Sequence, residues 1–188
     1  MRKIGLFIVA FLFGVLGVFA HLSHGAENEP LAFKNYVLGT TTLEQCRKMG
    51  FGMACGKGNG VLCDDQCYSY IETIGGVPAR EVNFLFYDGK LERIMISLSH
   101  SYFGKVVSAL KEKYGQPTEE TPVALQNRMG LPFRGTNYEW RRFANGIIRA
   151  SEYGSDLDTS NINYSTHHSI EEFTRRKQQS DKSGSKDL

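Results

Sequence analysis

The sequence lacks a surplus of charge of either sign once its first residues are set aside. Lysine and arginine number 22, and aspartate and glutamate number 20. Arg2 and Lys3 belong to an amino-terminal segment that we expect to be removed, which leaves 20 charges of each sign. Nucleic-acid binding depends on a basic excess that neutralises phosphates, so this balance argues against a nucleic-acid partner.

The motifs of several enzyme and cofactor classes are missing as well. No C-x-x-C spacing is present, so we do not expect a redox-active cysteine pair. A phosphate-binding loop around Lys57 would need a glycine where Phe51 stands and a hydroxyl residue where Gly58 stands. No grouping combines a nucleophile, a base and an orienting residue. We therefore predict no catalytic residues, no cofactor and no enzymatic activity.

The first twenty residues are typical of an export signal. A short basic start precedes the apolar run Ile4–Ala20, and Val18 and Ala20 are small residues at the positions that signal peptidase prefers. We expect cleavage before His21 and a periplasmic or secreted protein. The alternative is an uncleaved anchor, because the run is at the lower edge of the roughly 17–25 residues that span a bilayer. Membrane contact is expected only in that case.

The four cysteines, Cys46, Cys55, Cys63 and Cys67, lie close together in the sequence. In an exported chain an even number predicts disulfides, here two, and the three possible pairings stay open. Zinc sites favour two closely spaced ligand pairs, and only Cys63 and Cys67 have such a spacing. We therefore predict a disulfide-crosslinked loop and no metal.

The rest of the chain predicts one α+β domain. We expect a linker over residues 21–30, a single domain over 31–174 and a disordered polar tail over 175–188, which has one apolar residue. Alternating apolar residues predict strands, and Asp88-Gly89 and Asn145-Gly146 predict hairpin turns. The expected strands cover residues 31–37, 68–73, 79–87, 91–98, 136–143 and 147–153.

Three helices are expected among these strands. The first begins with Thr41 as N-cap and Glu44 three residues later, as in a capping box. The others cover residues 101–114, where apolar residues recur with a helical period, and 169–177. Residues 118–135 are expected to form a long loop with one helical turn. The prediction is an antiparallel sheet of about four to five strands with two or three helices packed on one face.

Three segments carry a resemblance to known exported domains. They are Leu38-Gly39-Thr40-Thr41 before a helix, the hairpin Phe86-Tyr87-Asp88-Gly89-Lys90-Leu91, and Lys113-Tyr114-Gly115-Gln116-Pro117 at a helix end. Their order resembles the small α+β domains of the outer-membrane assembly lipoprotein (BamE/SmpA-like) and of β-lactamase-inhibitor-protein-like folds. The resemblance implies a non-enzymatic binding module of the periplasm. The lipoproteins carry a cysteine directly after the signal, whereas the first cysteine here is Cys46.

These observations predict an exported binding protein that acts on a protein partner in the envelope, as an inhibitor or an accessory factor. Two loops are the candidate binding elements, and their residues are Gly56, Lys57, Asn59, Asp64, Asp65, Arg128, Phe133 and Arg134. Two alternatives stay open. One is a small envelope hydrolase that uses His100 or His167, and the other is a structural protein anchored through Ile4–Ala20.

Overall fold

The computed structural model describes residues 28–50, 53–70, 72–126, 129–154 and 156–184. The expected signal over residues 1–20, most of the expected linker, and Arg128 lie outside the described residues. The described chain is α+β, with α1 (Leu43–Met49), α2 (Phe103–Tyr114) and α3 (His167–Gly184) beside β-strands. No helix among the described residues is long and apolar enough to cross a membrane.

Eight antiparallel strands form the main sheet, in the spatial order β3-β4-β7-β8-β12-β11-β10-β9. The prediction of four to five strands is therefore too low. The strands are β3 (Ala54–Lys57), β4 (Asp65–Ser69), β7 (Glu81–Tyr87), β8 (Lys90–Ser99), β9 (Glu119–Gln126), β10 (Pro132–Trp140), β11 (Gly146–Ser151) and β12 (Thr159–Thr166). Two short hairpins lie outside this sheet, namely β1 (Ala32–Phe33) with β2 (Tyr36–Val37), and β5 (Thr73–Ile74) with β6 (Val77–Pro78).

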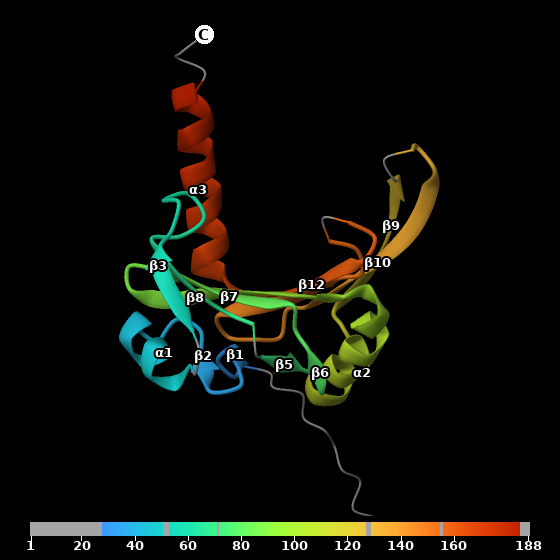
Figure 1. Ribbon diagram of the computed structural model, residues 1–188, viewed down its shortest axis with the longest axis horizontal. Helices are drawn as coiled ribbons and strands as arrows, with labels where there is room; N and C mark the ends of the chain where they lie inside the picture. Colours follow the sequence, from blue (N-terminus) through green and yellow to red (C-terminus); the bar gives the residue numbers. More distant parts are fainter. Residues whose placement is uncertain (1–27, 51–52, 71, 127–128, 155, 185–188) are drawn as a thin grey trace, which may run out of the picture.

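The sheet has a packed face and an open face (Figure 1). Helices α1 and α2 and the two short hairpins cover the packed face, whereas α3 stands on the opposite side, which we call the open face. We expected two or three helices on one face; α1 and α2 share a face, and α3 lies on the other. The β9–β10 hairpin rises on the same side as α3, near the other end of the sheet.

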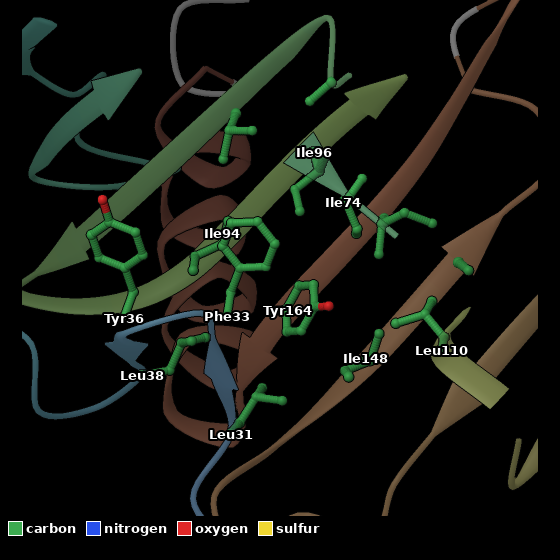
Figure 2. Packing of buried hydrophobic residues seen from close by; sticks show 14 of the residues in the cluster. Leu31, Phe33, Tyr36, Leu38, Ile74, Ile94, Ile96, Leu110, Ile148 and Tyr164 are labelled. Carbon is green, nitrogen blue, oxygen red and sulfur yellow. The ribbon is translucent and has the colours of Figure 1, made fainter. Parts of the chain in front are cut away.

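The core lies on the packed face. Figure 2 shows Leu31 and Phe33 from the first hairpin against Ile94, Ile148 and Tyr164 of the sheet. All five side chains are buried, and the same cluster takes in the apolar face of α2. That face consists of Phe103, Val106, Val107 and Leu110, the residues whose helical spacing predicts this helix.

Several local predictions are confirmed. Asp88 and Gly89, with φ of 50° and 74°, form the turn between β7 and β8, as expected of a two-residue hairpin. Gly115 ends α2 with a φ of 78°, and its carbonyl accepts a hydrogen bond of 2.9 Å from Nε1 of the buried Trp140. The end of the helix is thereby attached to β10.

Other local predictions are wrong in detail. The N-cap of α1 is Thr42, one residue later than expected, with Gln45 completing the capping box. The segment 31–37 is a hairpin, in which Lys34 has a φ of 53°. Residues 119–126 and 132–140 form the β9–β10 hairpin where we expected a loop. The turn before β11 is longer than Asn145-Gly146, because β10 ends at Trp140.

The carboxyl-terminal helix also differs from the prediction. Helix α3 continues through residues 175–184, where we expected a disordered tail. Arg176 in this segment bonds to Asp64, which lies 112 residues earlier in the chain. Such tertiary contacts stabilise a helix whose own composition is too polar to predict one.

One disulfide is present where two were expected. Cys55 and Cys67 face each other across β3 and β4 and are bonded. Cys46 and Cys63 are buried free thiols. Cys46 belongs to the core of the packed face, whereas Cys63 packs with Leu85 and Tyr87 in a separate cluster. Burial raises the pKa of both thiols, that of Cys46 to about 12, so neither is activated for exchange.

Candidate functional site

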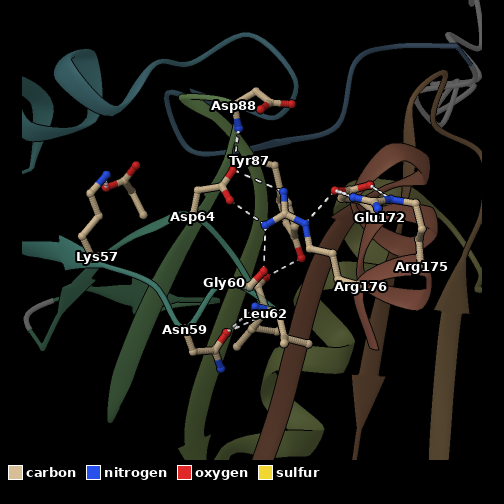
Figure 3. A network of polar contacts seen from close by, with 12 residues as sticks. Lys57, Asn59, Gly60, Leu62, Asp64, Tyr87, Asp88, Glu172, Arg175 and Arg176 are labelled. Carbon is tan, nitrogen blue, oxygen red and sulfur yellow. Dashed lines mark hydrogen bonds and ion pairs between the residues drawn. The ribbon is translucent and has the colours of Figure 1, made fainter. Parts of the chain in front are cut away.

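The crosslinked loop between β3 and β4 was one of the predicted binding elements. Its polar groups are engaged within the protein (Figure 3). Asn59 Oδ1 accepts hydrogen bonds from the backbone amides of Val61 and Leu62, at 3.1 and 2.6 Å. Asp64 accepts a bond of 2.5 Å from Arg176 and one of 2.9 Å from the amide of Asp88. These residues shape the loop and hold it to α3.

The remaining predicted residues of this loop, Gly56, Lys57 and Asp65, lie on or next to strands β3 and β4. Lys57 is 85% exposed and pairs with Asp65 at 2.9 Å, a surface ion pair of the kind that contributes about 0–1 kcal/mol. A side chain at Gly56 would meet no neighbouring atom within 4 Å. Gly56 and Lys57 therefore lie on an accessible strand surface, but they converge on no common point with Asp64.

The other predicted element is on β10, at the opposite end of the sheet. Phe133 packs edge-on against Tyr153, with ring centroids 5.0 Å apart, and Arg134 is exposed. Because β3 is one edge strand and β9 the other, the structure does not bring the two predicted loops together. They do not form one site.

The histidines form no accessible catalytic pair in the part of the chain that the structure describes. The His100 ring stacks on Tyr153 at 4.6 Å, and its Nδ1 lies 3.2 Å from the carbonyl of Glu152. Ser160 Oγ is 3.5 Å from the same nitrogen, but Ser160 is fully buried and donates to the Glu152 carbonyl. His167 and His168 are exposed at the start of α3. Among the described residues, no three His, Cys, Asp or Glu side chains gather to hold a metal.

The open face of the sheet carries polar side chains in rows that cross the strands. Strand pairing aligns one row from β7 to β9, and we call this row the polar row. It consists of Glu81, Ser97, Asn161, Ser151, Asn137 and Thr121. Every member is partly or largely exposed. Because successive strand residues point to opposite faces, their sequence neighbours, such as Val82 and Ile162, are buried in the core.

A hollow of about 290 Å³ lies on the open face where α3 meets the sheet, and we call it the arginine pocket. Arg93 and Arg149 line it together with Asn163, Ser165 and Thr174. Its apolar lining comes from Met95, Ile147, Ile170 and Phe173. Strand β12 supplies Asn163 and Ser165 and lies between the strands of the two arginines, β8 and β11. Both guanidinium groups therefore face the same hollow.

Arg93 is held in place by the first turns of α3. One of its terminal nitrogens donates to the carbonyl of Ser169 at 3.3 Å, and its guanidinium lies 5.3 Å from the Phe173 ring. Thr166 anchors this turn, because its hydroxyl donates to buried Glu92 and accepts from the Ser169 amide at 3.0 Å. The Nε of Arg93 is buried without a hydrogen-bond partner.

The two arginines differ in their counter-charges. Arg149 pairs with Glu139 at 3.1 Å. Burial raises the pKa of Glu139, but hydrogen bonds from Arg141 and Arg149 outweigh it, and the net shift is downward. Burial lowers the pKa of Arg93, and the nearby Arg149 lowers it further. No carboxylate forms an ion pair with Arg93 among the described residues.

Comparison of the chain with protein-family models, with curated proteins and with solved structures finds no match. The site is therefore argued from its own geometry. Sequence reasoning missed Arg93 and Arg149. The available signal was the alternation within residues 90–99 and 146–151, which places each arginine opposite the apolar residues of its strand. Their convergence depends on strand order, which no local pattern reveals.

Proposed function

We propose that this chain is an exported, non-enzymatic binding protein of the cell envelope, and that the open face of its sheet contacts a protein partner. The single observation that supports this most is the polar row. It crosses six strands, from β7 to β9, and its members are partly or largely exposed. Figure 1 shows the stretch of sheet that lies between α3 and the raised end of the β9–β10 hairpin. No helix or strand of the described residues covers that part of the face, and the connection between β11 and β12 rises beside it, with Gly154 next to the Asn161 side chain.

The β9–β10 hairpin adds exposed apolar side chains to this surface. Met129 is 80% exposed and Leu131 is 58% exposed, both in the connection that precedes β10. Protein interfaces combine apolar contacts with polar groups that fix orientation. The polar row supplies the polar groups, and the exposed apolar residues of the β9–β10 hairpin supply the apolar contacts.

The crosslinked loop has a supporting role in this proposal. The Cys55–Cys67 disulfide joins β3 to β4, and Asp64 at the end of this loop binds Arg176 of α3. The loop thereby holds one wall of the proposed surface in position. It acts on the partner through α3 and not through free groups of its own.

Site-specific photocrosslinking in the envelope tests the proposal. A photoreactive residue would replace Asn161 or Asn137 of the polar row, and in a matched control it would replace Arg47, an exposed residue of α1 on the far side of the sheet. We expect both row positions to crosslink the same protein, and excess unmodified protein to suppress that product. The Arg47 position should give no such product. Crosslinking from Arg47 alone, or from no position, would overturn the proposal.

The hydrolase alternative has less support. Ser160, whose hydroxyl lies 3.5 Å from His100 Nδ1, is fully buried and bonded to a backbone carbonyl, so a substrate does not reach it in this arrangement. A nucleophile must be accessible and must donate to its base. Alanine at His100, His167 and His168 should leave the photocrosslinks unchanged if the chain acts by binding.

A further inference from the structure

The arginine pocket contains a charge that the protein itself does not balance. Arg93 is partly buried, and desolvation makes a cation without an anion costly. Its guanidinium group donates to the Ser169 carbonyl and lies over the Phe173 ring, and its Nε has no hydrogen-bond partner. An anion in the hollow would supply the missing counter-charge and would accept hydrogen bonds from the terminal nitrogens of the guanidinium group.

The surrounding charges favour a single negative charge on this anion. Arg149 also lines the hollow but already pairs with Glu139. One uncompensated positive charge is therefore left, that of Arg93. A carboxylate matches it, and its two oxygens fit the planar fork of a guanidinium. A phosphate dianion would bring more charge than the pocket balances.

The apolar lining of the arginine pocket indicates which kind of chemical group would carry the carboxylate. Met95, Ile147, Ile170 and Phe173 provide apolar surface beside the arginines. The volume of about 290 Å³ is at the lower end of the roughly 300–1,000 Å³ of small-molecule pockets, too small for a nucleotide or a long chain. An aromatic or short aliphatic group would fill this space.

We propose that the arginine pocket binds a monocarboxylate carried on an apolar group. Arg93 forms the ion pair with the carboxylate, Asn163 and Ser165 offer hydrogen-bond donors beside it, and the side chains of α3 enclose the apolar part. Such a carboxylate is found on a small organic acid and at the carboxyl terminus of a peptide with an apolar last residue. Both sources share this chemistry.

Calorimetric titration of the full mature protein with a matched set of small probes tests the proposal. The main probe is N-acetyl-phenylalanine. N-acetyl-phenylalanine amide lacks the carboxylate, N-acetylglycine lacks the apolar group, and inorganic phosphate tests for a general anion site. We expect the main probe to bind saturably and at least about tenfold more tightly than the other three. Comparing 3-phenylpropionate with the peptide Ala-Ala-Phe then shows which source of carboxylate the pocket prefers.

Variants assign the binding to this pocket. Arg93→Gln should weaken binding of the main probe by at least about tenfold, and Arg149→Gln by less, because Arg149 keeps Glu139 as its partner. Thr174→Trp changes an exposed helix residue and fills the hollow while both arginines stay, so it should abolish binding even if Arg93→Gln fails to fold. Arg47→Gln, an equal loss of charge on α1, should have no effect.

Equal affinity for the amide, for N-acetylglycine or for phosphate would overturn the proposal, as would unchanged binding in Thr174→Trp. Absence of saturable binding by every probe would overturn it too. The inference does not depend on the proposed protein partner, because these titrations contain no partner. Photocrosslinking from Asn161 can therefore succeed where the titrations fail, and the two outcomes are distinguishable.

Discussion

The two faces of the main sheet differ sharply although the same strands build both. Across the central strands, the packed face presents Phe84, Ile94, Tyr164 and Ile148 in one row, all of them buried. On the open face, the polar row crosses the same strands with asparagine, serine and glutamate. One face holds the protein together, and the other is accessible to ligands.

The open face buries far fewer apolar side chains than the packed face does. Its buried side chains gather around α3, where Leu85, Tyr87 and Cys63 form a small separate cluster. The main core takes in residues from both short hairpins, from α1 and α2, and from the central strands of the sheet. The residues of the polar row lie outside this core, whereas their sequence neighbours, such as Val82 and Ile162, belong to it.

The largest expected effect comes from two neighbouring residues of β12. Ile162 is fully buried on the packed face, and its replacement by alanine should lower the free energy of unfolding by about 2–5 kcal/mol. Asn161 is the next residue and belongs to the polar row, so Asn161→Ala should change that free energy by about 0.5 kcal/mol or less. Urea denaturation of both variants measures the contrast. Equal losses would show that the open face also carries the fold.

The packed face was largely predictable from the sequence. Val82, Phe84 and Phe86 alternate with other residues, Asp88-Gly89 specifies the turn, and the apolar period of residues 103–110 specifies α2. These signals are local: each depends on spacing within one element. The fold class followed from them, whereas the number of strands did not.

The open face was not predictable, because its features depend on distant contacts. Strand β9 has few apolar residues, and it becomes a strand by pairing along the whole of β10. The disulfide on the packed face likewise depends on a distant contact, namely the register that places Cys55 opposite Cys67. Arg93 and Arg149 meet only because β12 lies between their strands. None of these facts has a signature in local composition or periodicity.

A second, smaller effect is expected where α3 meets the crosslinked loop. Arg176 bonds to Asp64 and to the Gly60 carbonyl, and its guanidinium lies 4.9 Å from the Tyr87 ring. Arg176→Gln should lower the free energy of unfolding by about 1.5–3 kcal/mol, since bonds to a charged group are lost. The matched control is Arg175→Gln. Within the described part of the chain Arg175 bonds to Glu172 and Gln179 of its own helix, so its loss should leave the free energy of unfolding nearly unchanged.

Amide hydrogen exchange tests whether the loss of stability in Arg176→Gln is confined to the open face. In Arg176→Gln the amides of α3 should exchange faster, while those of α2 on the packed face stay protected. Uniform acceleration in both helices would contradict the distinction between the two faces. Unchanged stability in Arg176→Gln would show instead that α3 stays on the sheet through the anchor at Thr166, Ser169 and Glu92 alone.

The smallest expected effect is the loss of stability at low pH that comes from the contact of Arg176 with Asp64 and Glu172. The hydrogen bond from Arg176 holds the pKa of Asp64 below its ordinary value of 3.8, and bonds from Arg175 and Arg176 lower that of Glu172 from 4.5 to about 2. A carboxylate whose pKa is lower in the folded state adds stability above its unfolded pKa and loses it as the pH falls through the folded pKa. Stability should therefore decline between about pH 4.5 and pH 2. Urea denaturation across this range should show a shallower decline in Arg176→Gln, and an unchanged decline would mean that other carboxylates cause it.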